Sequence, residues 1–324
     1  MISDIDRSRF EALAASGLTG SEVAALAAKV RAGDPDSEGA ARSLAAALAH
    51  AAFLAPERIA EYYDQAAHGW YGVPVAAPAV FTPTISNDPA PLAPEFWADF
   101  WGLVNDTGTG MDAGTVTVRT AALGAHLSTG YTERLAKACL AYPGVAAAAS
   151  GGPPGRFHLD DLAACPEGSL GHAFYRMTID NGFDLEVLDR DSLNLERLPE
   201  PLHYLNARML QVHDLWHIVG GYHLTGLHEI AISGFQMAQF GHGYSAMFLA
   251  MVVGSTSLKA GAYTPLMLDT ILSAWVHGRQ TPALLGVVWE DIWAKPADEI
   301  RSLLGVRLYN SPFPPDIFEQ AAAA

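Results

Sequence analysis

Apolar residues recur at the three- and four-residue spacing of α-helices along most of the chain. In the Ala-rich first part, Asp34-Pro35-Asp36-Ser37 is typical of a helix start, and the helix should run to about Leu54. Pro56-Glu57-Arg58 predicts the first turn of another helix. Only Gly114–Thr120, which contains Thr-Val-Thr-Val, has the alternation of a strand. The pattern therefore predicts an all-α protein, a multi-helix bundle.

Further helices are predicted in the second half of the chain, with Gly220-Gly221 ending the longest of them. Their approximate ranges are 94–103, 132–141, 158–164, 168–181, 200–219, 226 into the 240s, 265–280 and 289–304. Between Gly72 and Pro94 six prolines rule out regular helix and predict an extended connector on the surface. We therefore divide the chain into an N-terminal helical extension (1–72), a Pro-rich connector with short elements (73–128) and a helical domain (129–324).

The stretch from Ile230 to Leu258 holds no charged residue and is long enough to cross a bilayer. Polar residues nevertheless interrupt it at helical spacing. They are Ser233, Gln236, Gln239, His242 and Ser245. We expect a buried helix of a soluble protein, with this polar stripe facing a polar cavity.

Acidic residues outnumber basic residues by 35 to 19, which gives a formal net charge of −16. This balance argues against nucleic acid as a partner and against strong electrostatic binding to anionic lipid. The two cysteines, Cys139 and Cys165, have no paired spacing, so we expect a reducing compartment without disulfides. The first residues lack the apolar core of a secretory signal. The expected location is the cytoplasm.

A candidate metal site lies near the end of the longest predicted helix. His213 and His217 are four residues apart, so their rings project from one helical face and can share a divalent ion. Asp214 is adjacent, and Glu229 follows the Gly220-Gly221 break near the start of the next helix. Two antiparallel helices would bring Glu229 back to the histidines. Two imidazoles and two carboxylates suit zinc or another divalent first-row metal.

Other interpretations of these residues remain open. A pair of histidines at this spacing is common by chance, and a His-Asp doublet also marks one class of metal phosphohydrolase. That class requires a further upstream His and a distant Asp. A zinc protease is disfavoured because Asp214 stands where the His-Glu-x-x-His motif has its general base.

The string His-Asp-x-x-His, followed by eleven residues and Glu229, resembles the signature of the fourth ubiquinone (coenzyme Q) biosynthesis protein family. Cys165–Phe174 is similar to that family's Pro-x-Gly-Thr-Leu-Gly helix start. Arg208 stands where the family has an arginine, and Phe235 and Gln239 match its Phe and Gln positions. Later matches are Gly278-Arg279-Gln280, Trp289-Glu290-Asp291, Arg301 and Leu304-Gly305-Val306. The resemblance covers about residues 129–310.

The resemblance implies an all-α protein acting late in ubiquinone synthesis, in the metal-dependent oxidative removal of the C1 carboxylate from a polyprenylated 4-hydroxybenzoate-type ring. It gives His213, Asp214, His217 and Glu229 the role of catalytic metal ligands, with zinc as the expected ion. Substrate binding is expected at Arg208, Phe235, Gln239 and Arg279, with the two arginines holding the ring carboxylate or forming a surface salt bridge instead. The implied partners are a polyprenylated aromatic lipid, other enzymes of the pathway and a second copy in a homodimer, peripherally on the inner face of the membrane.

Two features depart from the family pattern. Leu210 occupies a position where the family usually has a second basic residue, and His223 and His228 lie within the eleven-residue spacer. We expect these two histidines to be surface or loop residues. From another functional class, a lipid-binding scaffold with a structural metal remains an alternative to the enzyme.

Overall fold

The computed structural model describes residues 2–80, 88–106, 113–186, 190–191 and 193–323. In these ranges the chain forms α-helices joined by loops and short 3-10 turns, and it contains isolated β-bridges but no β-strand. The all-α prediction is confirmed. The 3-10 turns are η1 (Pro56–Arg58), η2 (Gly124–His126), η3 (Leu195–Arg197), η4 (Gly261–Tyr263) and η5 (Trp289–Asp291).

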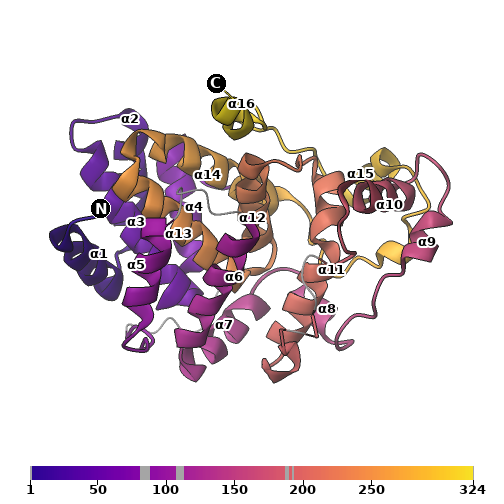
Figure 1. Cartoon of the computed structure of the whole chain (residues 1–324), viewed down its shortest axis with the longest axis horizontal. Helices are drawn as coiled ribbons and strands as arrows, with labels where there is room; N and C mark the ends of the chain where they lie inside the picture. The colour runs from indigo at the N-terminus through magenta and orange to yellow at the C-terminus, as the bar shows by residue number, and fades with distance from the viewer. Residues whose placement is uncertain (1, 81–87, 107–112, 187–189, 192, 324) are drawn as a thin grey trace.

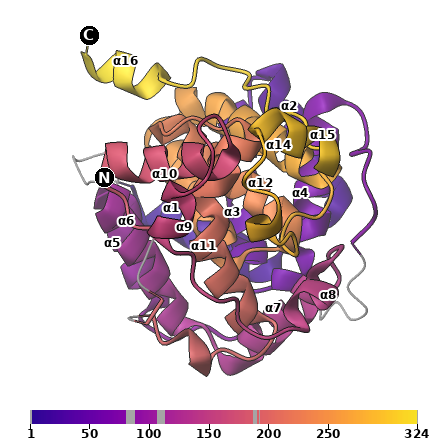
Figure 2. The ribbon, with the colours of Figure 1, turned by 90° about the vertical axis from the view of Figure 1, so that its right-hand side faces the viewer.

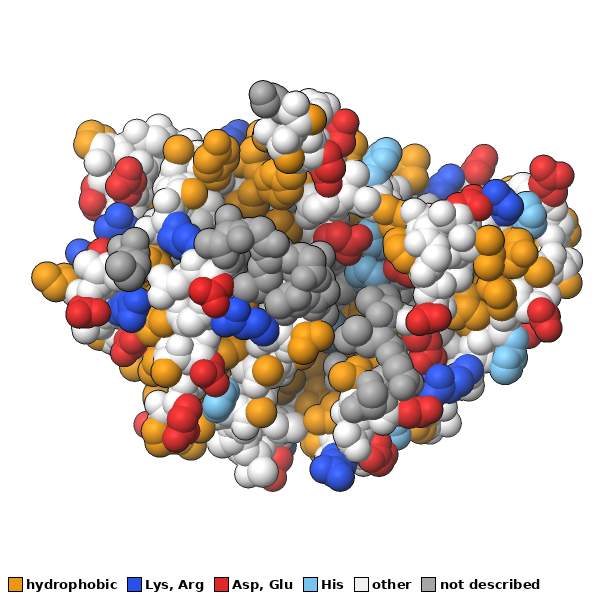
Figure 3. Space-filling view, in the orientation of Figure 1, with side chains coloured by type: hydrophobic (Ala, Val, Ile, Leu, Met, Phe, Trp, Pro, Cys, Tyr) orange, Lys and Arg blue, Asp and Glu red, His pale blue; other side chains and the backbone are white. Residues whose placement is uncertain are grey.

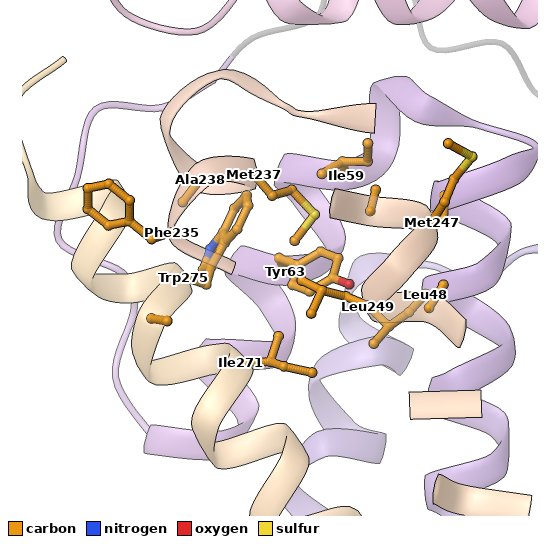
Figure 4. Packing of buried hydrophobic residues seen from close by; sticks show 14 of the residues in the cluster. Leu48, Ile59, Tyr63, Phe235, Met237, Ala238, Met247, Leu249, Ile271 and Trp275 are labelled. Atoms are coloured by element: carbon orange, nitrogen blue, oxygen red, sulfur yellow. The ribbon is translucent and has the colours of Figure 1, made fainter. Parts of the chain in front are cut away.

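Four helices open the chain: α1 (Asp4–Ser16), α2 (Gly20–Ala32), α3 (Ser37–Phe53) and α4 (Ile59–Tyr71). They pack on one another, and α3 and α4 also pack on two C-terminal helices, α13 (Gly243–Lys259) and α14 (Thr264–Gln280) (Figure 1). Tyr63 of α4 lies against Trp275 of α14, with ring centroids 5.1 Å apart, and Met237 lies beside this pair (Figure 4). The N-terminal and C-terminal helices therefore share one hydrophobic core. The boundaries at residues 72 and 128 stay a prediction.

The middle of the chain forms α5 (Phe96–Asp106), α6 (Ala113–Leu123), α7 (Thr129–Leu140) and α8 (Val145–Ala149). The strand predicted at Gly114–Thr120 is wrong, because these residues belong to α6. Val116 is half-buried and Val118 is 62% exposed, while α6 packs on α5 and α13. No partner strand is described nearby, so helical hydrogen bonds satisfy the backbone. The propensity cost of β-branched residues in a helix is only about 0.5 kcal/mol each.

The C-terminal part contributes α9 (Leu159–Ala163), α10 (Leu170–Asn181), α11 (Leu202–Gly220), α12 (Gly226–Phe240), α13, α14, α15 (Ala297–Leu304) and α16 (Ile317–Ala323). Helix α12 packs on α13 and α14 and is buried along most of its length. Helix α11 runs along the side of the molecule that faces the viewer in Figure 2, where α16 projects from the helical body.

The uncharged stretch from Ile230 to Leu258 forms parts of two helices, where one was predicted. Gly241 ends α12 with φ +71°, and a Cβ atom there would lie 2.7 Å from the Tyr142 ring. A side chain is therefore excluded at this turn by both conformation and space. Among the described residues, no helix combines the length and the hydropathy needed to cross a membrane.

The helix predicted at 289–304 is also divided, because Pro296 precedes α15 and separates it from η5. The Pro-rich connector is non-helical in its described parts, 73–80 and 88–94, as predicted; Pro83 lies outside the described residues. Hydrogen bonds fix this segment to the helical body, among them one from the Ala90 backbone N–H to the Leu54 carbonyl at 2.8 Å. Arg134 and Arg279 also donate to the carbonyl oxygens of Asp88 and Pro78.

Candidate metal centre

The chain reversal between α11 and α12 brings the four predicted ligands together. Val212, Trp216 and Val219 are fully buried and hold α11 against the core, which leaves His213 and His217 on another face of the helix. Gly221 ends α11 in the left-handed conformation, with φ +78°, and the chain turns back into α12. Glu229 lies in the first turn of that helix.

Three of the four side chains meet at nearly equal distances. The Nε2 atoms of His213 and His217 are 3.3 Å apart. Nε2 of His213 lies 3.4 Å from Oε2 of Glu229, and Nε2 of His217 lies 3.4 Å from the other oxygen, Oε1. Tetrahedral zinc bonds of about 2.0–2.1 Å place donor atoms about 3.3–3.4 Å apart, so this spacing suits a single ion. The Asp214 carboxylate is 3.9 Å from Nε2 of His213, and the donor atoms of His213, Asp214 and His217 all lie within 4.8 Å of one another.

The other ring nitrogen of each histidine also has a partner. Nδ1 of His217 lies 3.3 Å from the carbonyl oxygen of Tyr222. Nδ1 of His213 forms a close hydrogen-bond contact with the side-chain amide of Gln236 on α12. Contacts of this kind orient the imidazole rings of metal sites. Tyr222 and Gln236 were not predicted to touch the site, although Gln236 belongs to the polar stripe that the sequence showed.

Burial and mutual charge set the protonation of the cluster. Burial acts to lower the pKa of His213, but hydrogen bonding and charge from Glu229, together with Asp214 and Gln236, outweigh it and raise this pKa. Burial acts to raise the pKa of Glu229, yet its bonds to the two histidines hold it well below the usual range. Burial raises the pKa of Asp214, against the opposing effect of both rings. Glu229 is therefore the carboxylate most strongly held in the ionised form.

The site opens to solvent on the side of Glu229. Its side chain is 43% exposed, whereas the side chain of His217 is 1% exposed. Histidine and acidic side chains also gather in a hollow of the surface between the left-hand helices and the α10–α15 part of the molecule (Figure 3). A ligand could therefore approach from the carboxylate side, while His217 anchors the site from inside.

The residues predicted to bind substrate make protein contacts. Arg208 is buried, and its guanidinium donates to the carbonyl oxygens of Leu285 and Val287. The Arg279 side chain is 2% exposed and pairs with Asp64 of α4 at 3.2 Å. Arg279 thus forms a salt bridge, but not the surface bridge of the predicted alternative, because its own side chain is buried and Asp64 is 28% exposed.

Phe235 and Gln239 also face the interior of the protein. Phe235 packs against Trp216, with ring centroids 5.5 Å apart. The Gln239 amide donates to the Gly278 carbonyl at 2.8 Å and accepts from the Leu284 backbone N–H at 2.9 Å. These contacts fix the turn after α14. The assignment of these residues to substrate binding stays a prediction.

The two spacer histidines differ from each other. His223 is exposed, as expected, but His228 is 2% exposed on α12, so the expectation of a surface or loop residue is wrong for it. Its Nδ1 accepts a hydrogen bond from the His223 backbone N–H at 2.8 Å. His228 lies among the buried residues of α12, so its ring points into the protein. The spacer sequence alone did not show this.

Comparison with known proteins gives matches to part of the chain. Residues 155–310 match the family model described as coenzyme Q (ubiquinone) biosynthesis protein Coq4. The mitochondrial ubiquinone biosynthesis protein COQ4 of Eremothecium gossypii is 29% identical over 167 residues, covering 49% of this chain and 46% of that protein. The mitochondrial COQ4 homologues of Mus musculus and Homo sapiens are 29% identical over 150 residues, covering 46% of this chain and 54% of theirs. The chain thus spans about half the length of these curated relatives.

A solved crystal structure of a protein from Nostoc punctiforme PCC 73102 has a similar fold. The TM-score is 0.50 at 24% sequence identity, and the match covers 66% of this chain and 97% of that chain. At this identity the likeness concerns the fold.

Proposed function

Because residues 155–310 belong to the Coq4 family of coenzyme Q (ubiquinone) biosynthesis proteins, we propose that the chain is a metal-dependent enzyme of that pathway. The proposed reaction is the oxidative C1-decarboxylation of a polyprenylated 4-hydroxybenzoate-type intermediate. The proposed ligands are His213, Asp214, His217 and Glu229, with zinc as the first candidate ion.

The observation that carries this proposal is the convergence of α11 and α12. The Nε2 atoms of His213 and His217 and the Glu229 carboxylate are spaced by 3.3 to 3.4 Å, and the neighbouring Asp214 offers a further oxygen. The donors are two imidazoles and two carboxylates, which divalent first-row ions accept. A simple salt bridge would pair Glu229 with one histidine, whereas here the rings of His213 and His217 both face its carboxylate.

A bound divalent ion would act as a Lewis acid toward the ring carboxylate or phenolate, stabilising the charge that develops as carbon dioxide leaves. The protein's own residues provide the geometry. The Tyr222 carbonyl holds the His217 ring, and Glu229 stands on the open side, where the substrate would arrive. Arg208 and Arg279 are engaged with protein groups, so for either to hold the carboxylate it would have to exchange those contacts.

The reaction removes two electrons from the ring carbon, and zinc cannot accept them. We therefore include dioxygen as the oxidant and water as the source of the hydroxyl oxygen. The aromatic acid, one dioxygen and one water then give the phenol, carbon dioxide and hydrogen peroxide. The bond from C1 to the carboxylate carbon breaks, and a bond from C1 to oxygen forms.

For the polyprenyl tail we propose a surface of α13 next to the site. Tyr244 and Phe248 are half-buried there and stack with ring centroids 6.2 Å apart. Tyr244 in turn lies 5.9 Å from the ring of His242, which connects to Gln236 through Ser245. An apolar chain leaving the metal centre along α13 would meet these two aromatic rings first.

A scaffold that presents the same lipid to other enzymes of the pathway is the second candidate. The names of the curated relatives state ubiquinone biosynthesis and no reaction. Arg208 and Arg279 are engaged in protein contacts, which leaves a bound ion as the main group that would attract the substrate's carboxylate. Homodimerisation and peripheral attachment to a membrane belong to either candidate as proposals.

The experiment incubates the purified full chain with the carboxylated polyprenyl precursor, zinc or another divalent ion, and dioxygen. The expected product is the C1-hydroxylated, decarboxylated ring with a stoichiometric amount of carbon dioxide. Glu229→Gln keeps the size of the side chain but removes its charge, so metal content and turnover should both fall. His223→Gln changes an exposed histidine in the neighbouring loop and serves as the control.

Tight lipid binding without turnover under every metal tested would favour the scaffold. Full turnover by metal-stripped protein, or by Glu229→Gln and His213→Ala with no bound metal, would show that the ion is not catalytic.

A further inference from the structure

A chain of hydrogen bonds runs from the candidate metal centre into the core along α12 and α13. His213 contacts the Gln236 amide, and the Gln236 oxygen lies 3.4 Å from the Ser245 hydroxyl. The Ser245 oxygen then lies 2.9 Å from Nδ1 of His242. Gln236, Ser245 and His242 are all buried. We call His213, Gln236, Ser245 and His242 the relay.

The arrangement of these atoms defines a direction of donation. The amide nitrogen of Gln236 faces Nδ1 of His213, so Gln236 donates and Nδ1 accepts. In the neutral ring the proton of His213 is then on Nε2, which lies 3.3 Å from Nε2 of His217 and 3.4 Å from Glu229. At the other end, Ser245 donates to the Gln236 oxygen, which leaves His242 to donate from Nδ1 to Ser245.

The second histidine is constrained differently. Nδ1 of His217 faces the Tyr222 carbonyl oxygen at 3.3 Å, and a carbonyl oxygen only accepts. Nε2 of His217 lies 3.4 Å from Oε1 of Glu229, which also only accepts. When an ion takes up the Glu229 carboxylate, the Tyr222 carbonyl holds the His217 proton on Nδ1, and Nε2 offers its lone pair to the ion. His217 thus has a carbonyl partner at Nδ1, which suits ligation through Nε2. His213 has the Gln236 amide at Nδ1, which can either donate or accept.

Ligation through Nε2 of His213 requires its lone pair, so the ring proton must move to Nδ1. We propose that Gln236 is a positioning residue for the ion. Its amide turns by half a rotation to present oxygen to Nδ1 of His213, and the direction of donation then reverses along the whole relay. This inference rests on the proposed metal centre and adds to it the residue that selects the ligating tautomer.

The reversal also moves the ring proton of His242, the last residue of the relay. With its nitrogen now facing Ser245, Gln236 donates to the Ser245 oxygen, and the Ser245 hydroxyl donates to Nδ1 of His242. His242 must then carry its proton on Nε2. Burial, with a contribution from the charge of His213, lowers the pKa of His242 to about 3, so this ring is neutral and holds one proton in either arrangement. Each ring exchanges its proton with water, and neither gains a charge.

The tautomers can be read directly from two-bond proton–nitrogen NMR spectra of the imidazoles, recorded on the full chain in mildly alkaline buffer. On addition of zinc, His213 should change from the Nε2–H to the Nδ1–H pattern, and His242 should change from Nδ1–H to Nε2–H. His217 should show Nδ1–H in the zinc-bound protein. Ser245→Ala should uncouple His242 while leaving the change at His213. A zinc-bound protein in which His242 keeps its original tautomer would overturn the reversal.

Metal affinity provides a second measurement, by competition with a chromophoric chelator. Gln236→Met should weaken zinc binding by about 10- to 100-fold, as loss of a ligand-orienting partner commonly does. Gln236→Glu supplies a permanent acceptor and should keep affinity near that of the unaltered chain. Gln239→Met is the matched control, because Gln239 is a buried glutamine on the same helix whose amide bonds to the turn after α14.

The outcomes separate this inference from the proposal on which it rests. If the unaltered chain binds no divalent metal, the metal centre itself is refuted. If the unaltered chain binds zinc through His213 and Gln236→Met binds it equally well, only the positioning role of Gln236 is refuted.

Discussion

The phenolic oxygen of Tyr222 lies 2.7 Å from Nδ1 of His277. The backbone carbonyl of the same tyrosine is the partner of His217, so α14 holds the turn that orients a candidate ligand. Tyr309 adds a second support: its backbone N–H donates to the Gly220 carbonyl at 2.8 Å, and its ring stacks on Tyr222 with centroids 4.6 Å apart. The geometry at the end of α11 thus depends on segments far away in the sequence.

Gly221→Ala tests this dependence. Gly221 has φ +78°, and a Cβ atom would approach a Leu308 side-chain carbon to 2.8 Å, so the turn that carries the Tyr222 carbonyl should shift. We expect a loss of about 1 kcal/mol in the free energy of unfolding together with weaker zinc binding. The measurements are urea unfolding and chelator competition.

Gly33→Ala is its control, because Gly33 also ends a helix in the left-handed conformation and a Cβ atom there would meet nothing within 4 Å. It should lose similar stability and keep zinc affinity. Equal zinc affinity in both variants would contradict the role given to the Tyr222 turn.

Sequence periodicity predicted the helices that bring the candidate ligands together. The four-residue spacing of His213 and His217 places both on one face of a helix in any protein, and Gly220-Gly221 marks its end. Glu229 then needs only a short reversal to reach them. Local rules of this kind require no knowledge of distant contacts.

The remaining features depend on contacts that no local pattern encodes. The residues of α6 have strand-like alternation but become helical against α5 and α13. The break at Gly241 follows from the approach of Tyr142, about a hundred residues earlier in the chain. Arg279 looked available for substrate in sequence, but Asp64 on α4 meets it across the core.

Breaking the Arg279–Asp64 pair should destabilise the fold. The Arg279 side chain is 2% exposed and that of Asp64 is 28% exposed. Among the described residues, Arg279→Met therefore leaves this partly buried carboxylate with the Trp275 indole as its remaining side-chain donor. We expect a loss of about 3 kcal/mol in the free energy of unfolding, at the low end for buried pairs because water reaches Asp64. Urea unfolding measures it.

The control for this loss is Arg176→Met. Arg176 pairs with Asp180 one turn along α10, with side chains 56% and 50% exposed. Exposed pairs of this kind contribute about 0.3–0.5 kcal/mol. Comparable losses in the two variants would show that burial of the Arg279 pair does not matter.

The stability of the protein should fall in mild acid because of buried histidines. Burial lowers the pKa of His277 to about 4. A hydrogen bond to the Arg307 carbonyl opposes this lowering of the pKa, and the charge of Arg307 adds to it. The unfolded chain, with a His pKa of about 6.5, then binds more protons than the folded chain between about pH 4 and pH 6.5. Stability contributed by neutral His277 is complete above that window and declines as the pH falls through it.

The expected slope from one such histidine approaches about 1.4 kcal/mol per pH unit. His277→Gln should flatten the fall in unfolding free energy measured in urea from about pH 7.5 to about pH 5, although its stability at neutral pH is lower. His158→Gln, which changes an exposed histidine at the start of α9, should keep the slope of the unaltered chain. A slope that His277→Gln leaves unchanged would remove this ring from the explanation.

The aromatic pair on α13 should contribute to affinity only for a substrate with a tail. Phe248 stacks on Tyr244 at 6.2 Å and is half-buried, so a polyprenyl chain covering it would remove further apolar surface from water. Phe248→Ser should weaken binding of a long-tailed ligand by about tenfold, which corresponds to about 1.4 kcal/mol, and leave a tail-less ring analogue unaffected. Tyr263→Ser changes an aromatic residue that is 61% exposed elsewhere and is the control for general loss of surface aromatics. The measurement is equilibrium binding of both ligands to the unaltered chain, Phe248→Ser and Tyr263→Ser. An equal loss of affinity for the tail-less ring would place Phe248 at the head group and not along the tail.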